Sequence, residues 1–336
     1  MGTSDASTTA RTADGPAGPR VVVLGRLPGD AVERLRARHT VHYRDEDSTA
    51  PAEEVLRLVS GADALVVTLG HRVDAAVLDA AGPQLRIVAN VAVGYDNVDV
   101  ATCRERGVLV TNTPGVLTDA TADLAFALVL MVTRRLAEAE REVRSGQTAG
   151  WGMFHLLGTS VQGKAIGILG PGAIGLATAR RARAFGMDVL LSGRSAPDPA
   201  DVRALQARVV PFEELLASSD VVSVHTPLTP ATLHLVDASA LARMKPAAYL
   251  VNTARGPVVD EAALVAALEA GTIAGAGLDV FEDEPRVHPG LRERDDVVLL
   301  PHIGSATIET RTAMADLAAD NVLAVLAGDD ALTPVG

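Results

Sequence analysis

Gly170, Gly172 and Gly175 have the spacing Gly-x-Gly-x-x-Gly between an apolar segment (165–169) and a helix-like segment (173–185). In such a turn the first glycine bends the chain, the second lets the backbone approach a pyrophosphate, and the third lets helix and strand pack closely. The N–H groups at the start of the helix then face the anion. The sequence therefore predicts a dinucleotide-binding turn formed by Gly170, Gly172, Ala173, Ile174 and Gly175.

The apolar strand expected after this helix ends in Leu-Ser-Gly-Arg-Ser, residues 191–195. NAD-binding domains place an acidic residue about 20 positions after the glycines, where it accepts hydrogen bonds from the ribose hydroxyls. No acid stands there, and the Arg194 guanidinium could bind a 2′-phosphate through charge-assisted hydrogen bonds. We therefore expect NADP(H) to be preferred over a usable NAD(H), with Gly193, Arg194 and Ser195 at the ribose. The alternative is that Arg194 is a surface residue and that Asp198 or Asp201 reaches back to the ribose.

Short apolar blocks alternate with helix-like segments along the chain, which is typical of parallel sheets covered by helices. One series of strands is expected at 21–25, 64–69, 85–90 and 108–111. A second series is expected at 165–169, 188–191, 221–224, 248–252, 273–280 and 297–300. The second series suffices for a complete dinucleotide-binding domain. The predicted fold class is therefore α/β, with two doubly wound parallel-sheet domains.

Two further segments set the domain organisation. The sequence from Thr118 to about Ser145 predicts one long helix with Thr118 as its N-cap, and residues 307–326 predict a final helix that packs on a neighbouring domain. We expect residues 1–19 to be a disordered tail. A Rossmann cofactor domain (115–304) is then inserted in a flavodoxin-like substrate domain (20–114 and 305–336).

The 336-residue chain has a formal net charge of -12 and no cluster of lysine and arginine. Nucleic acids and anionic membranes are bound through concentrated positive charge, so neither is an expected partner. No apolar run reaches the roughly 20 residues that span a bilayer, and the N-terminal segment lacks the apolar core of a secretory signal. These features predict a cytoplasmic protein whose partner is a small molecule. We predict no metal ligands.

From residue 60 to 327 the chain resembles the D-isomer-specific 2-hydroxyacid dehydrogenase family. Besides the glycine turn, the matching segments are Val93-Gly-Tyr-Asp-Asn-Val-Asp99, Asn112-Thr-Pro-Gly-Val-Leu-Thr-Asp-Ala-Thr-Ala-Asp123, Asn252-Thr-Ala-Arg-Gly256, Gly277-Leu-Asp-Val-Phe-Glu-Asp-Glu-Pro285 and Pro301-His-Ile-Gly-Ser-Ala-Thr307. The segment 112–123 resembles the glyoxylate and hydroxypyruvate reductase branch, and the Ser-Gly-Arg strand end is similar to its NADPH-using members. The resemblance implies that a nicotinamide cofactor reduces a small 2-keto acid to a D-2-hydroxy acid.

The resemblance implies that Arg255, Glu284 and His302 are the catalytic residues, and the chemistry agrees. Arg255 follows a strand at the sheet edge where ligands bind, and its forked guanidinium can hold carbonyl and carboxylate oxygens. The alternative for Arg255 is a loop arginine in a salt bridge. His302 follows the last strand and suits proton donation, because an unperturbed imidazole titrates at about pH 6.5. The family places the acid directly before a proline, which selects Glu284 over Glu282 and Asp283 as the partner of His302.

The turn at Val93 and Gly94 can offer backbone N–H groups to a substrate carboxylate without a cation, which favours a small monoanionic keto acid. We also expect the segment after the strand 64–69 at the far end of the substrate, where the polar His71 would favour a hydroxyl or a second anionic group. The predicted substrate-binding residues are Leu69, Gly70, His71, Val93, Gly94, Arg255 and Ser305.

By resemblance, Asp279 hydrogen-bonds the nicotinamide amide and Thr121 lines the other side of the ring. His225 is interpreted as structural or as lining the cofactor. The family also pairs as dimers through the region of residues 151–157, so we expect a homodimer in which this segment either reaches the partner subunit's site or fills the interface. The remaining predicted cofactor residues are Thr226, Pro227, Thr253, Ala254, His302 and Gly304.

Other functions compete with a keto-acid reductase. The same scaffold also serves cofactor-sensing regulatory proteins, and fold alone does not exclude a binding role. Formate-oxidising enzymes resemble this family but carry glutamine at the position of Glu284, which counts against formate. Phosphite would be expected to need a cation at the turn of Val93 and Gly94, and none is present there.

Overall fold

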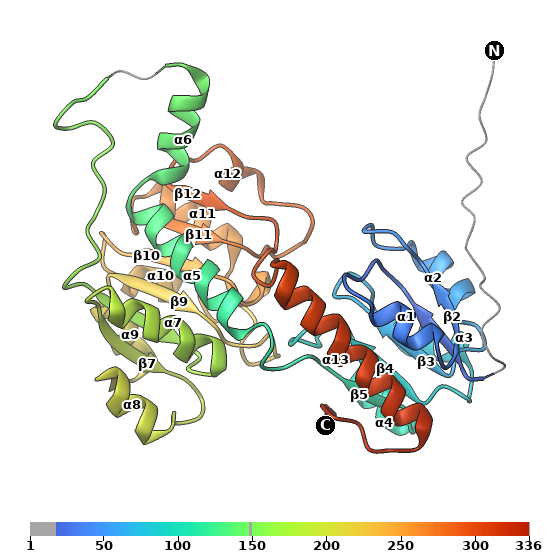
Figure 1. The fold of residues 1–336 in the computed structure, drawn as a ribbon. Coiled ribbons are helices and arrows are strands. Elements are labelled where there is room, and N and C mark those ends of the chain that lie inside the picture. Colours follow the sequence, from blue (N-terminus) through green and yellow to red (C-terminus); the bar gives the residue numbers. More distant parts are fainter. Residues whose placement is uncertain (1–17, 148–149, 336) are drawn as a thin grey trace, which may run out of the picture. The chain divides into compact units, whose positions relative to one another are not determined.

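The computed structural model describes residues 18–147 and 150–335, which fold into two compact units (Figure 1). The first unit contains the described residues up to Leu117 and the segment from Ala306 onward, and the second runs from Thr118 to Ser305. Each unit is built on one parallel sheet. The predicted α/β fold class with two parallel-sheet domains is thus confirmed.

The sheet of the first unit has five parallel strands in the order β2-β1-β3-β4-β5. This is the flavodoxin-like order, and folds of this kind bind ligands at the carboxyl ends of the strands where the order reverses, here β1 and β3. The strands are β1 (Arg20–Val23), β2 (Thr40–Tyr43), β3 (Ala64–Val67), β4 (Ile87–Asn90) and β5 (Leu109–Thr111). The helices are α1 (Ala31–Arg36), α2 (Ala52–Val59), α3 (Ala75–Ala81), α4 (Val100–Glu105) and α13 (Ile308–Ala327).

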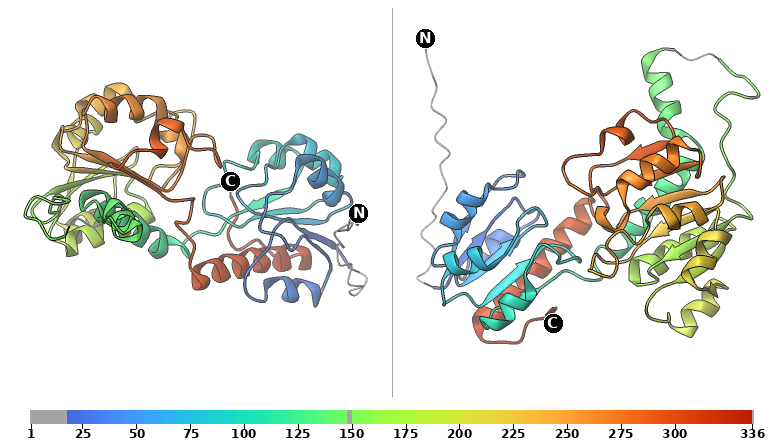
Figure 2. Two further views of the ribbon diagram at one scale, coloured as in Figure 1. Left: turned by 90° about the horizontal axis from the view of Figure 1, so that it is seen from above. Right: turned by 180° about the vertical axis from the view of Figure 1, so that it is seen from behind.

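Successive residues of each strand point to opposite faces of the sheet, so each face has its own core. Val21 and Val23 pack with α1 and α13 on one face, whereas Val22 and Leu65 pack with α2, α3 and α4 on the other. Figure 2 shows α13 (red) extended along its face of the five-stranded sheet. Because both faces are covered, the strands appear in the sequence as short apolar runs.

The sheet of the second unit has seven parallel strands in the order β12-β11-β10-β9-β6-β7-β8. The order reverses between β6 and β9, as in dinucleotide-binding domains. The strands are β6 (Ala165–Leu169), β7 (Asp188–Ser192), β8 (Arg208–Val209), β9 (Val221–Val224), β10 (Tyr249–Asn252), β11 (Gly275–Leu278) and β12 (Val297–Leu299). The helices are α5 (Thr118–Thr133), α6 (Leu136–Ser145), α7 (Ala173–Ala184), α8 (Pro199–Leu205), α9 (Phe212–Ser218), α10 (Ala238–Arg243), α11 (Glu261–Glu269) and α12 (Pro289–Arg292).

Helices cover both faces of this second sheet as well. Ile166 and Ile168 of β6 pack with α5 and α7 on one face, and Leu169 and Leu250 pack with α9, α10 and α11 on the other. The carboxyl ends of β6 and β9 therefore lie between two layers of helices. In folds of this kind the turns that follow these strands bind the ligand.

The structure corrects two details of the predicted elements. The sequence analysis missed β2 and β8, which are edge strands with one buried residue and none, so neither forms an apolar run. The single helix predicted from Thr118 to Ser145 is wrong, because the left-handed backbone of Arg135 (φ 55°) separates α5 from α6. Thr118 is the first residue of α5 and not its N-cap. Within the described residues no helix combines the length and apolar character needed to cross a membrane.

Candidate active site

The glycine turn follows β6 directly. Gly170 has a φ of 94°, which glycine adopts without a Cβ penalty, and a Cβ there would lie 2.8 Å from Thr226 N. Gly172 is the N-cap of α7, whose first N–H groups have no partner within the helix. A Cβ on Gly175 would overlap the carbonyl oxygen of Gly170. The turn therefore packs against the end of β9 and places the start of α7 at the reversal of strand order.

The local packing fits a dinucleotide. A Cβ on Gly172 would meet no atom within 4 Å, so the backbone at this position is open to a phosphate. At the end of β10 the Thr253 hydroxyl is buried and has no hydrogen-bond partner among the described residues. An unpaired buried hydroxyl is costly, which suits it to bond a ligand. The open backbone and the unpaired hydroxyl both lie at the carboxyl edge of the sheet.

The segment after β7 lies beside the glycine turn, since a Cβ on Gly193 would be 2.6 Å from Pro171. Arg194 is exposed in this segment. Asp198 caps α8 and accepts a hydrogen bond at 2.7 Å from a backbone N–H of that helix. The Asp201 carboxylate lies 3.9 Å from a guanidinium of α7. Both acids that could replace Arg194 at the ribose therefore have interactions of their own around α8.

The loop that carries Arg255 is held from both sides. The Asn252 side chain accepts a hydrogen bond from Ala254 N at 3.0 Å and donates one to the Arg255 carbonyl at 2.9 Å. Gly256 packs so closely on the Phe281 backbone that no side chain would fit there. These contacts fix the backbone of Arg255 against the segment that follows β11.

His302 has a left-handed backbone (φ 53°), which residues with a Cβ seldom adopt. The Asp279 carboxylate holds this turn by accepting hydrogen bonds from Ile303 N and Gly304 N, each at 2.8 Å. The Asp279 carbonyl accepts a further bond at 2.8 Å from His302 N. Burial raises the pKa of Asp279, and the two backbone N–H bonds and the His302 charge act in the opposite direction. A buried carboxylate thus fixes the backbone that presents the imidazole.

Glu284 and His302 form a pair, with Glu284 Oε2 2.8 Å from His302 Nδ1. The second carboxylate oxygen accepts a hydrogen bond from Phe281 N at 3.0 Å. Burial raises the pKa of Glu284, but the hydrogen bond and charge of His302, with a contribution from the Arg255 charge, lower it overall. The structure therefore brings Arg255, Glu284 and His302 into one electrostatic group within the second unit.

In the first unit the turn after β4 presents Val93 and Gly94. The side chains of Asn112 and Asn90 donate hydrogen bonds at 2.8 Å to the carbonyls of Val93 and Gly94, respectively. No acceptor among the described residues bonds the backbone N–H groups of Val93 and Gly94. The two asparagines thus hold the turn by its carbonyls, and its N–H groups are left for an anion.

Leu69 and Gly70 lie in the turn after β3, at the reversal of strand order in the first unit. His71 is buried, with Nε2 accepting a hydrogen bond from Ala50 N at 3.2 Å and Nδ1 3.0 Å from Thr68 Oγ1. Burial lowers the pKa of His71, so its imidazole is neutral near pH 7. Both ring nitrogens are engaged within the unit. The predicted contact between His71 and the substrate stays a prediction, and it would have to replace one of these bonds.

The other predicted residues lie at strand ends of the second unit. Thr121 lies near the start of α5 beside Gly304, where an added Cβ would be 3.3 Å from its side chain. The His225 ring lies 2.8 Å from the Ser223 hydroxyl, and burial lowers its pKa to about 4. Ser195 follows β7, Thr226 and Pro227 follow β9, Ala254 follows β10, and Ser305 follows β12.

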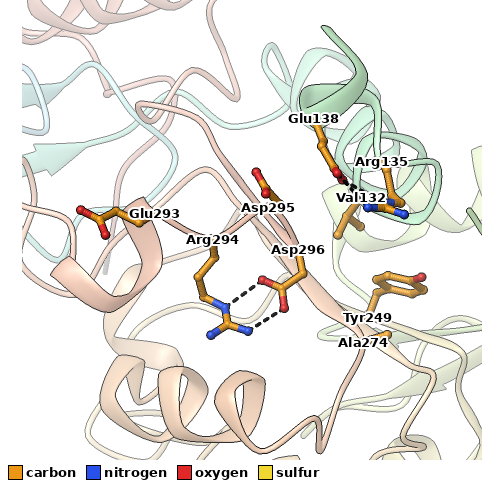
Figure 3. A pocket seen from close by; sticks show the side chains of 9 residues that line it. All are labelled: Val132, Arg135, Glu138, Tyr249, Ala274, Glu293, Arg294, Asp295 and Asp296. Carbon is orange, nitrogen blue, oxygen red and sulfur yellow. Dashed lines mark hydrogen bonds and ion pairs between the residues drawn. The ribbon is translucent and has the colours of Figure 1, made fainter. Parts of the chain in front are cut away.

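A separate pocket of about 570 Å³ opens at the amino edge of the second sheet (Figure 3). Tyr249 begins β10 and Asp296 precedes β12 at this edge. Four of its charged side chains form two ion pairs, Arg294 with Asp296 at 2.7 Å and Arg135 with Glu138 at 2.8 Å. None of the predicted site residues lines it. The candidate active site is therefore at the opposite, carboxyl edge.

A phosphate-binding turn, a reversal of strand order and a carboxylate–imidazole pair near an arginine share the carboxyl edge of one sheet. Together they define a dinucleotide-dependent oxidoreductase. The turn is suited to anchor a cofactor, and a carboxylate–imidazole pair within the same unit is suited to donate or accept a proton.

Comparisons with known proteins place this class more closely. Residues 126–304 match the family model of the D-isomer specific 2-hydroxyacid dehydrogenase NAD-binding domain. Glyoxylate reductases from Thermococcus onnurineus and Pyrococcus furiosus are 47% and 46% identical over 315 residues, covering 93% of this chain and 94% and 93% of theirs. The crystal structure of a Sinorhizobium meliloti NADPH-dependent glyoxylate/hydroxypyruvate reductase in complex with NADP and malonate has a TM-score of 0.84 at 39% identity, covering 95% of this chain and 97% of that one.

The chain therefore belongs to the D-isomer-specific 2-hydroxyacid dehydrogenase family, and the predicted resemblance is confirmed. It is an NAD(P)-dependent oxidoreductase of the D-2-hydroxyacid dehydrogenase type.

The sequence analysis missed the residues whose side chains hydrogen-bond the backbone of the site's loops. Asn90, Asn112 and Asn252 fix the loops that carry the predicted substrate-binding residues. Each ends or directly follows an apolar strand, and Asn90 and Asn252 are fully buried. A polar residue at the end of a buried run was a usable signal, because a buried amide must find hydrogen-bond partners.

Proposed function

We propose that the enzyme reduces a small 2-keto acid, glyoxylate, hydroxypyruvate or a close analogue, to a D-2-hydroxy acid, with NADPH as the preferred cofactor. The observation that carries the proposal is the 2.8 Å contact between Glu284 and His302 in the field of Arg255. The names of the relatives, glyoxylate reductase and glyoxylate/hydroxypyruvate reductase, support the choice of substrate.

Each step of the reduction has a residue suited to it. Arg255 holds the carbonyl and carboxylate oxygens of the substrate, and the N–H groups of Val93 and Gly94 are proposed as further carboxylate donors. A bound NADPH supplies the hydride that the keto carbon accepts. Because Glu284 holds Nδ1 of His302, Nε2 is the ring atom that donates a proton to the carbonyl oxygen. The carboxylate stabilises the imidazolium before transfer, and the neutral ring then regains a proton from solvent.

The cofactor preference rests on the segment after β7. Arg194 is exposed there, and the carboxylates of Asp198 and Asp201 interact with α8 backbone and an α7 guanidinium. A 2′-phosphate would thus meet a cation without a competing carboxylate at the strand end. The other proposed cofactor contacts are those expected from the sequence. They include the contact of Thr253 and the hydrogen bond of Asp279 to the nicotinamide amide.

The test follows the loss of reduced nicotinamide absorbance with glyoxylate and hydroxypyruvate, comparing NADPH with NADH in the wild type and in Arg194→Ala. Loss of a charge-assisted phosphate contact is worth about 1.5–3 kcal/mol, so we expect the KM for NADPH to rise on the order of 10- to 100-fold. The KM for NADH should stay near the wild-type value. Arg243→Ala is the matched control, because Arg243 is an exposed arginine in the last turn of α10.

Other outcomes decide among the alternatives. A wild type that prefers NADH would contradict the cofactor assignment. NADPH binding without turnover on a panel of keto acids would favour a cofactor-sensing binding protein, and reduction of NADP⁺ by formate or phosphite would favour oxidation of a small anion.

We also infer that the enzyme is a cytoplasmic homodimer. Large apolar side chains are exposed around α6 and the loop that follows it, including Val143 (66% exposed), Trp151 (89%) and Phe154 (88%). Several large exposed apolar side chains in one part of the chain favour an interaction surface, which supports a second copy of the chain as its partner. Whether residues 151–157 reach the partner subunit's site stays a prediction.

A further inference from the structure

Glu261 is a buried acid outside the catalytic group, only 6% exposed at the first turn of α11. The helix does not need it as a cap, because the Asp260 side chain already accepts the hydrogen bond from Ala263 N at 2.9 Å. Burial raises the pKa of Glu261, and the nearby Glu282 carboxylate contributes in the same direction. Ionising Glu261 near pH 7 therefore costs folding free energy, so its contacts should explain its presence.

The Glu261 carboxylate is bound to a loop and not to a cation. Its Oε1 accepts a hydrogen bond from Glu282 N at 2.6 Å, and a backbone hydrogen bond from His288 also favours the charged form. In return, Glu261 N donates a bond at 3.3 Å to Glu282 Oε2. The buried carboxylate thus holds the backbone at residue 282, in the loop that carries Glu284.

A chain of contacts leads from this anchor to the proton donor. The segment anchored at Glu282 begins with Phe281, whose N–H donates to Glu284 Oε1 at 3.0 Å, and Glu284 Oε2 lies 2.8 Å from His302 Nδ1. The same segment packs against the backbone of Gly256, next to Arg255. The repulsion between the Glu261 and Glu282 carboxylates is offset because Glu282 Oε1 lies 2.7 Å from His234 Nε2.

We propose that Glu261 is a positioning residue that sets the place of the Glu284 carboxylate relative to His302. The inference rests on the proposed function, in which Glu284 and His302 act together in proton transfer. Glu261 touches neither of these side chains, so its effect passes through the backbone from residue 281 to 288. Displacing a catalytic group by about 1 Å can lower a rate on the order of 100-fold.

The test compares Glu261→Gln and Glu261→Ala in the full-length enzyme. Glutamine keeps the size of the side chain but removes its charge and replaces one acceptor oxygen by an N–H donor, so the hydrogen bond from Glu282 N is weakened. We expect kcat for keto-acid reduction to fall on the order of 10- to 100-fold, with the KM of the keto acid and the Kd of NADPH within about threefold. The alkaline limb of the pH–rate profile should move to lower pH, because a displaced Glu284 stabilises the imidazolium less.

Glu269→Gln is the matched control, since Glu269 is an exposed glutamate at the other end of α11. It should leave kcat, the pH profile and Tm unchanged. Tm and NADPH fluorescence titration show whether each Glu261 variant is folded, and the glutamine variant decides if the alanine variant is not.

The proposal is overturned if the Glu261 variants keep the wild-type kcat and pH profile, or if both parameters change only in proportion to a loss of folded, NADPH-binding protein. Glu284→Gln and His302→Asn separate this failure from that of the proposed function. If those two variants retain full turnover, the proposed function fails. If they lose turnover while Glu261→Gln does not, the positioning role alone fails.

Discussion

At the scale of single residues, the His302 backbone is held in a conformation that costs a residue with a Cβ about 1–3 kcal/mol. Two hydrogen bonds from the following N–H groups to the buried Asp279 carboxylate offset this cost. Glu284 then fixes the ring through Nδ1. Backbone and side chain of His302, the proposed proton donor, are therefore constrained by separate acids, one on each side of the loop after β11.

The charge of Glu284 should make stability depend on pH. Its pKa is lowered below the ordinary 4.5, because the hydrogen bond and charge of His302 and the Arg255 charge outweigh the effect of burial. A carboxylate with a lowered pKa stabilises the fold above its unfolded pKa, and this contribution is lost as pH falls through the folded value. Glu284→Gln should therefore flatten the fall in Tm by a few degrees as pH falls from about 5.5 through the lowered folded pKa.

Thermal denaturation across that range checks this prediction. Glu293→Gln is the control, because Glu293 is exposed near the end of α12 and its loss should leave the profile unchanged. A Glu284→Gln profile that follows the wild type would show that the ion pair contributes no stability.

Arg255, Glu284 and His302 could be proposed from the sequence because each has a motif and a chemical requirement, and the structure brings the three together. The role of Glu261 could not, since its partner segment lies 21 residues further along the chain and is brought close only by the folded loop. The engaged nitrogens of His71 were equally hidden, because one of them bonds the backbone at Ala50. Sequence motifs indicate residues expected to contact a ligand, whereas the residues that hold those residues in place are identified only from the packing of the folded chain.

At the scale of elements, the glycine turn contains glycines with two different roles, one that leaves space for a ligand and one that allows close packing. The backbone of Gly172 (φ -80°) suits any residue and a Cβ would point into open space, so Gly172→Ala should keep Tm within about 2 °C. It should raise the Kd of NADPH at least roughly tenfold, because the methyl group occupies the space of the pyrophosphate. Gly175→Ala should instead cost about 1–3 kcal/mol of stability, because its Cβ overlaps Gly170 O.

Thermal denaturation and NADPH fluorescence titration distinguish the two variants. Equal binding by Gly172→Ala and the wild type would mean that no phosphate approaches this glycine. An unchanged Tm for Gly175→Ala would mean that the close packing of β6 and α7 relaxes freely.

Strands that bury several side chains could be predicted from their apolar runs, including the edge strands β5 and β12, whereas the edge strands β2 and β8 could not. β2 and β8 bury too few side chains to give such a run. The break at Arg135 also lacks a sequence signal, because neither glycine nor proline marks it and the charged residues around it favour a helix. Burial on both faces of a sheet produces an apolar run in the sequence, whereas a local change of backbone direction between polar residues produces no such pattern.

At the scale of the whole molecule, the exposed aromatic residues should decide the oligomeric state. We expect light scattering after gel filtration to give about twice the 34.7 kDa mass of one chain for the wild type, and one chain for the double variant Trp151→Ser, Phe154→Ser. Removing two large apolar side chains from an interface costs several kcal/mol of association. Leu233→Ser is the control, because Leu233 is 55% exposed elsewhere. A monomeric wild type, or a dimeric double variant, would contradict this interface.

Helix α13 has a consequence for how the protein is made. Its Ala315, Ala318 and Val322 complete the core over Val21 and Val23, and Val335 N bonds to Val110 O at the edge strand β5. The ribosome synthesises all five strands of this sheet long before helix α13, because the entire second unit is synthesised in between. In the nascent first sheet, this apolar face is therefore covered only in part, by α1, while the second unit can already fold. A chaperone that shields apolar surface would act on the N-terminal part of the chain.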